Sequence, residues 1–189
     1  MGRLDNRSVD EFKSHIGFTT EIESRLMECW AQSLNSDCLA YMDNGVDNSG
    51  QYVEDGLNTS DVDFIVVTED GPEKTELKFV PTAGKLTLKL NDVRNYIRQK
   101  ARVLFIFNTG KESLKVPKDL DIEAHWKRIA NAHLKGELKW ALVDHKTLAK
   151  MLSSTEPQKI PYMGGKQGII ITEKRYSNFF NLMDFVYDN

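Results

Sequence analysis

Three residues of the chain have the types and spacing of a hydrolytic metal site: Asp63, Glu76 and Lys78. Asp63 opens an apolar run that continues to Val67, and the other two lie in a second run that ends at Val80. Because alternate side chains of a strand share a face, we expect Glu76 and Lys78 to lie side by side. Two carboxylates suit a hard divalent cation, and an adjacent amine can place or deprotonate a water. Phosphodiester hydrolysis requires these parts.

The residues between the two runs predict that the runs pair as a hairpin. Residues 68–73 contain Asp-Gly-Pro, which is typical of a turn. The pairing would bring Asp63 close to Glu76. Asp61 shares a face with Asp63 if the first strand begins early, so it is the rival metal ligand; we prefer Asp63 because the apolar run follows it directly. The alternative interpretation is an ordinary surface hairpin with a weak Glu76–Lys78 pair.

Asp63 followed by Glu76-x-Lys78 resembles the motif of the PD-(D/E)xK nuclease superfamily, which includes type II restriction enzymes and Holliday-junction resolvases. Val62 stands where the family motif has its proline, which many members also lack. The resemblance covers roughly residues 20–110 in the order of their predicted elements. It implies an α/β fold with a restriction-endonuclease-like core, in which helices flank a central mixed β-sheet.

The resemblance also implies a chemistry. Asp63, Glu76 and the backbone carbonyl of Leu77 would hold Mg²⁺, for which Mn²⁺ would substitute, and Lys78 would orient or deprotonate the attacking water. Cleavage of DNA phosphodiesters would leave 5′-phosphates, without a small-molecule cofactor or a membrane partner. The first expectation is a homodimer that cuts duplex DNA as restriction enzymes do. A junction resolvase or other structure-specific nuclease, a non-catalytic DNA-binding module and a protein–protein adaptor are the alternatives.

Glu23 is a further candidate ligand. The capping-box pattern Thr20-Glu21-Ile22-Glu23 predicts a helix that begins there and runs to about Leu34. In the resembled family, the helix before the active-site strands often lends a glutamate to the metal or its waters, and Glu23 matches that role. The alternative is that Glu23 only closes the capping box.

Charge is distributed unevenly along the chain. Residues 1–73 carry 4 basic and 16 acidic residues, whereas residues 74–102 carry 8 basic and 2 acidic ones. A basic track beside a metal site would supply phosphate contacts, which provide most of the affinity for DNA. The candidate DNA-binding residues are Lys85, Lys89, Arg94, Arg98 and Arg102. Each of them could equally belong to a solvated face, and Arg94 and Arg98 could instead pair with the acidic N-terminal segment.

Length and composition predict one domain over residues 1–189. The resemblance implies that it is a nuclease domain with its core at about 20–110. Residues 111–189 would be an extension of the same domain that serves DNA recognition or dimerisation. No apolar run approaches the roughly 18 residues of a membrane span, and the N-terminus lacks a signal-peptide pattern. Cys29 and Cys38 have no metal spacing and favour reduced thiols. We therefore expect a cytoplasmic protein.

Hydrophobic periodicity predicts the remaining elements. The apolar run at 102–108 predicts a strand buried on both faces of a central, partly parallel sheet. Residues 43–60 form a long irregular stretch, expected near the metal site. Strands are predicted at 38–42, 60–67, 74–80, 85–90, 138–143 and 168–172, and helices at about 91–100 (capped by Asn91 or Asp92), 122–134, 145–152 (capped by Asp144) and 174–187.

Overall fold

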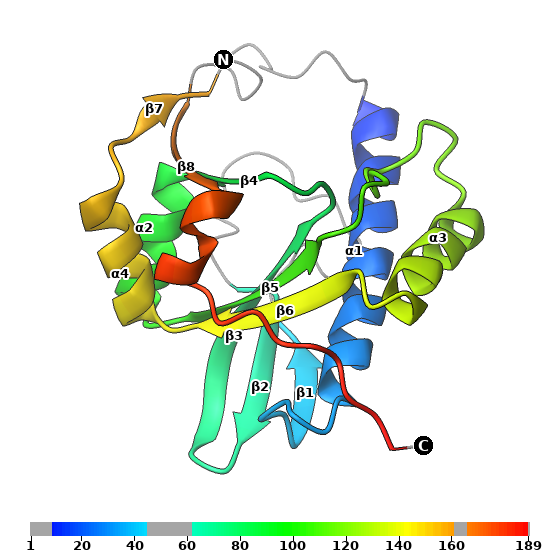
Figure 1. Cartoon of the computed structure of the whole chain (residues 1–189), viewed down its shortest axis with the longest axis horizontal. Helices are drawn as coiled ribbons and strands as arrows, with labels where there is room; N and C mark the ends of the chain where they lie inside the picture. The colour runs from blue at the N-terminus through cyan, green and yellow to red at the C-terminus, as the bar shows by residue number, and fades with distance from the viewer. Residues whose placement is uncertain (1–8, 45–61, 161–165, 189) are drawn as a thin grey trace.

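The computed structural model describes residues 9–44, 62–160 and 166–188, which form an α/β fold with a central mixed sheet flanked by helices (Figure 1). Within these ranges, no helix is both long and apolar enough to cross a membrane. The elements in chain order are α1 (Val9–Ala31), β1 (Ala40–Asp43), β2 (Phe64–Thr68), β3 (Gly71–Val80), β4 (Lys85–Lys89), α2 (Leu90–Gln99), β5 (Arg102–Asn108), α3 (Ile122–Leu134), β6 (Leu138–Val143), α4 (His145–Ser154), β7 (Gln158–Lys159), β8 (Gln167–Thr172) and the 3₁₀ helix η3 (Glu173–Asn178).

The central sheet has the strand order β1-β2-β3-β5-β6. Strands β1, β2 and β3 form an antiparallel meander, and β6 runs antiparallel to β5. Strands β3 and β5 are parallel. A parallel pair requires a crossover, and here the crossover consists of β4 and α2. Strand β4 pairs with β8 in a second, smaller sheet of order β4-β8-β7.

Strand β5 is buried on both faces, as its unbroken apolar run predicts. Its odd-numbered residues, among them Phe105, pack against one layer, made of α2, α4 and the small sheet. Its even-numbered residues, among them Leu104, pack against the other layer, made of α1 and α3. Figure 1 shows the two layers on opposite sides of the central strands. The residues around Glu76 and Lys78 in β3 therefore lie between two hydrophobic layers.

Several predicted elements are confirmed at their stated limits. Strand β5, helix α3 and strand β6 have the predicted bounds. The side chain of Asp144 caps α4 by accepting a hydrogen bond from the backbone N–H of Thr147 at 2.8 Å. Strand β6 pairs with β5, so the C-terminal part of the chain supplies one strand of the central sheet. Local sequence patterns were sufficient to predict these elements, because the hydrophobic pattern and the helix cap agree with the tertiary packing.

Two predicted helix starts are wrong. Helix α1 already begins at Val9, so Thr20 lies inside the helix and Glu23 closes no capping box. The neighbouring Thr19 hydroxyl donates to the carbonyl of His15, as threonines inside helices commonly do. Helix α2 begins after Lys89 without a side-chain cap; neither Asn91 nor Asp92 precedes it. Asn and Asp occur both as helix caps and inside the first turn of a helix. Only the path of the backbone shows which of these two positions such a residue occupies.

The helix predicted at 174–187 is also wrong. The chain forms η3 and then continues without regular structure, bridging to the sheet through paired hydrogen bonds between Trp140 and Met183. Phe180 packs into the layer with α2 and α4, whereas Met183 packs into the layer with α1 and α3. Phe180 and Met183, three residues apart, would lie on the same face of a helix and so could not be buried in opposite layers. The burial of these side chains therefore overrides the helical pattern.

Substitution of Leu77 tests how much the buried face of β3 contributes to the stability of the protein. This side chain is fully buried against the α1 layer, between the two site residues of β3. Leu77→Ala is expected to lower the free energy of unfolding by about 2–5 kcal/mol, because it leaves a cavity. Leu39→Ala, at a leucine that is 66 % exposed, is the matched control and should cost less than about 0.5 kcal/mol. Urea unfolding measures both. Equal costs for the two variants would contradict the packing described for β3.

Candidate active site

Asp63 lies where the β2–β3 ladder ends. The last paired residues are Phe64 and Thr75, and continuing the register places Asp63 opposite Glu76. Instead of extending the ladder, the Asp63 carboxylate accepts a hydrogen bond from the backbone N–H of Leu77 at 3.0 Å. The side chain thus takes the place of a strand partner at this position of β3.

Glu76 is buried, with 5 % of its surface exposed. Its Oε1 accepts a hydrogen bond from the Tyr96 hydroxyl at 2.6 Å, and the Lys78 ammonium also donates to it. Glu76 and Lys78 share one face of β3, as strand alternation predicts. Helix α2 covers that face, and the Lys78 ammonium lies 6.0 Å from the centre of the Tyr96 ring. A buried carboxylate requires such partners, because its desolvation is otherwise costly.

Glu23 reaches the same cluster from α1. Its side chain is half-buried, and its pKa is influenced by the charges of Lys78, Asp63 and Glu76. Glu23 therefore lies within electrostatic range of the other three side chains that are predicted for the site. We define these four residues, Glu23, Asp63, Glu76 and Lys78, as the carboxylate cluster.

The cluster carries an excess of negative charge. Burial, together with the nearby Glu76, raises the pKa of Asp63 to about 7, against the opposing effects of Lys78 and the Leu77 N–H. Burial also raises the pKa of Glu23 to about 8, with further contributions from Asp63 and Glu76. For Lys78, burial opposes the ammonium form, but the surrounding acids prevail and raise its pKa well above the ordinary value. Burial is the largest cause of the raised pKa values of the two acids, and the repulsion among three carboxylates near one lysine adds to it.

The carboxylates of the cluster and the nearby Leu77 carbonyl are oxygen ligands of the kind that hard divalent cations prefer. The N–H and C=O of one strand residue point to the same edge, so the Leu77 carbonyl should face the Asp63 side of β3. In the described part of the chain, no group of three His, Cys, Asp or Glu side chains is already arranged to hold a metal ion. The Lys78 ammonium instead provides the counter-charge of Glu76.

The candidate DNA-binding residues divide into two groups. Lys85, Lys89, Arg94 and Arg98 are exposed on β4 and α2. Two of them make local contacts: Lys89 pairs with Asp92 at 3.8 Å, and Arg98 donates to Asn95.

Arg102 belongs to the second group. Its side chain is only 11 % exposed and forms ion pairs with Asp37 and with Glu73, the latter at 2.6 Å. It ties β5 to β3 and to the segment before β1. The expectation that Arg102 contributes to a basic track does not fit these contacts, because both acids compete for its guanidinium.

Tyr96 is a site residue that the sequence reasoning missed. It follows Val93 by three positions and so belongs to the buried stripe of α2, where it is 6 % exposed. That spacing was the available signal, but it does not show which buried acid the hydroxyl meets. Asp61, the rival ligand, and most of the irregular stretch at 43–60 lie outside the described residues.

The raised pKa of Glu23 predicts a pH-dependent stability. Folding favours the neutral form, so the native state is penalised progressively as the pH rises from about 4.5 through 8. Glu23→Gln mimics the neutral form. In the presence of EDTA its Tm should equal that of the wild type near pH 4.5 and exceed it by several degrees at pH 9. Glu28→Gln, at an exposed position of the same helix, is the control. A Tm difference for Glu23→Gln that does not change with pH would contradict this account.

No model of a known protein family, no curated protein and no solved structure matches this chain. The chemistry of the cluster is therefore the guide to function. One oxygen of the buried Glu76 carboxylate accepts hydrogen bonds from the Lys78 ammonium and from the Tyr96 hydroxyl, and the Asp63 carboxylate lies beside them.

Proposed function

We propose that the chain is a divalent-metal-dependent DNA endonuclease with a restriction-endonuclease-like core. One observation carries the proposal: Glu23, Asp63, Glu76 and Lys78 converge from α1, the start of β2 and β3. The sequence spacing alone would permit an exposed hairpin with a weak ion pair. The burial of Glu76 and the raised pKa values of Asp63 and Glu23 argue against that simpler interpretation.

The topology supports the same proposal. The resembled family is expected to have two active-site strands, a helix that crosses the sheet and a further strand. Here β2 and β3 are followed, after β4, by α2 and then by β5, which lies parallel to β3. Helix α2 places Tyr96 directly over the site. The family's order of elements and the position of its crossing helix are both compatible with this arrangement.

In this proposal, Asp63, Glu76 and the carbonyl of Leu77 hold Mg²⁺ or Mn²⁺, and Glu23 contacts the metal or its waters. The bound cation would polarise the scissile phosphate and lower the pKa of a bound water. Lys78 is held as an ammonium, so it would act as a hydrogen-bond donor and a positive charge toward the attacking water and the phosphate. Tyr96 is a positioning residue that holds one oxygen of Glu76.

The exposed cations Lys85, Lys89, Arg94 and Arg98 would contact DNA phosphates. Arg94 and Arg98 are one helical turn apart and can reach the same strand of phosphates. Each chain contains one carboxylate cluster, so cleavage of both strands of a duplex would employ two copies. We therefore propose a homodimer that leaves 5′-phosphates.

Cleavage assays test the enzymatic proposal. The wild type is expected to cut plasmid DNA with Mg²⁺ or Mn²⁺ and to lose the activity in EDTA. Asp63→Asn and Lys78→Met should lower the rate by at least about a hundredfold, because each removes an element of the metal-assisted step. Asp70→Asn and Lys74→Met, at exposed positions of the same hairpin, are the matched controls. If plasmid and branched DNA stay intact with both metals, while the wild type is folded, the enzyme proposal is wrong.

A thermal-shift measurement tests the metal site without activity. Saturating Mg²⁺ at pH 8 should raise the Tm of the wild type by a few degrees, because binding to the native state alone stabilises it. The increase should vanish in Asp63→Asn and persist in Asp70→Asn. Equal shifts in the two variants would place the bound cation away from the cluster.

A further inference from the structure

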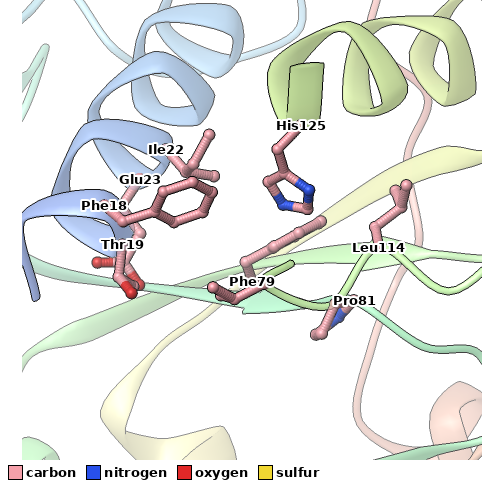
Figure 2. Close-up of a pocket in the computed structure, with 9 residues that line it drawn as sticks. Phe18, Thr19, Ile22, Glu23, Phe79, Pro81, Leu114 and His125 are labelled. Carbon is pink, nitrogen blue, oxygen red and sulfur yellow. The ribbon is translucent and has the colours of Figure 1, made fainter. Parts of the chain in front are cut away.

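A cavity of about 120 Å³ lies beside the carboxylate cluster, between α1, the first turn of α3 and the end of β3 (Figure 2). Its innermost side chains are buried and mostly apolar. Its outer side chains are half-buried or exposed, and Val116 among them is 41 % exposed. The lining residues are Phe18, Thr19, Ile22, Glu23, Phe79, Pro81, Leu114, Val116 and His125.

His125 gives this cavity a polar group. The residue is 2 % exposed, and within the described residues its Nδ1 is buried without a hydrogen-bond partner. Its ring lies 5.4 Å from the ring of Phe18, and Figure 2 shows it near Phe79 and Leu114. Burial and the nearby Arg128 lower the pKa of His125, which favours the neutral imidazole. A neutral imidazole offers one N–H donor and one acceptor, and a buried polar atom without a partner is rare.

Glu23 connects the cavity to the carboxylate cluster. It lines the cavity, and its pKa responds to Lys78, Asp63 and Glu76. A ligand whose phosphate lies at the cluster could therefore place an adjoining ring in the cavity. The aromatic walls of Phe18, Phe79 and His125 are the surfaces on which unstacked bases pack in proteins that bind single strands.

We propose that this cavity takes one unstacked pyrimidine base of the DNA strand being cut. The inference rests on the proposed nuclease function and names its substrate class: a strand with a base out of the stack, next to the scissile phosphate. Size favours a pyrimidine over a purine, because even a slightly larger enclosed cavity holds only one benzene-sized ring. The exocyclic groups and the sugar of the pyrimidine would lie at the mouth, beside the exposed Val116. His125 would hydrogen-bond the edge of the base, and Phe18 would pack against its face.

Binding is tested first, without metal or cleavage. The isotope-labelled full chain is titrated with dCMP in EDTA, and the Ile22 methyl and His125 imidazole resonances are followed. Both should shift in a saturable way, and less with dGMP. Val116→Trp should abolish the shifts by blocking the mouth of the cavity. Leu134→Trp, at an 83 % exposed position at the end of α3, should leave them unchanged. Unshifted resonances, or shifts that persist in Val116→Trp, would overturn the proposal; a bound water alone would give the first result.

Cleavage assays then test the base pocket separately from the nuclease activity. On DNA with one unpaired pyrimidine, Val116→Trp and His125→Phe should each lower kcat/KM by at least about tenfold. Val116→Trp excludes the base from its stacking surface, and His125→Phe removes the hydrogen bond to the base edge; both losses have effects of about this size. His133→Phe, a histidine on the same helix packed against Phe185, is the control. Normal cleavage by both pocket variants would overturn the pocket and leave the nuclease intact. Saturable dCMP shifts in a protein that cuts no DNA would refute the nuclease alone. If His125→Phe does not fold, the surface variant Val116→Trp decides.

Discussion

The burial of the Glu76 carboxylate is the constraint on which the site depends. An ionised carboxylate in the middle of a sheet is stable only with charged or hydrogen-bonding partners. Lys78, two residues along the same face, provides the charge, and Tyr96 provides a hydroxyl at 2.6 Å. Because Tyr96 lies on α2, the position of this helix decides whether Glu76 has its second partner. The crossover that makes β3 and β5 parallel also places Tyr96 over the acid.

A second consequence follows from the end of the β2–β3 ladder. Because pairing stops at Phe64 and Thr75, the Leu77 N–H is available to Asp63, and a third acid approaches from α1. The result is a group of neighbouring acids in which burial first, and repulsion among the acids second, raises the pKa values of Asp63 and Glu23. Such a group is stabilised by protonation at low pH or by an added cation, and this balance links the stability of the protein to its proposed chemistry.

The basic residues of the segment 74–102 have two different roles in the folded protein. Arg102 is part of the positive block, but its ion pairs with Glu73 and Asp37 join β5 to β3 and to the segment before β1. The exposed cations on β4 and α2 remain for an external anion. A count of basic residues therefore overstates the surface available to phosphates. The half-buried, ion-paired Arg102 stabilises the fold, whereas the exposed cations support the proposed contact with DNA.

Much of the fold was predictable from local signals. The alternation in β3 predicted that Glu76 and Lys78 share a face, and the turn predicted the hairpin that opposes Asp63 to Glu76. The unbroken run of β5 predicted its burial on both faces. The C-terminal helix prediction failed because those side chains divide between two layers.

The sequence by itself thus determined most of the strands, though not the short β7, and the local geometry of the hairpin, because alternation and turn chemistry act over a few residues. Only the tertiary structure decided that Glu23 joins the cluster, that Tyr96 meets Glu76, and that Arg102 is tied to acids. The cavity beside His125 is also a tertiary feature, since α1, α3 and the end of β3 enclose it together. These contacts join elements distant in sequence, so they depend on how helices pack on the sheet, which no local pattern specifies.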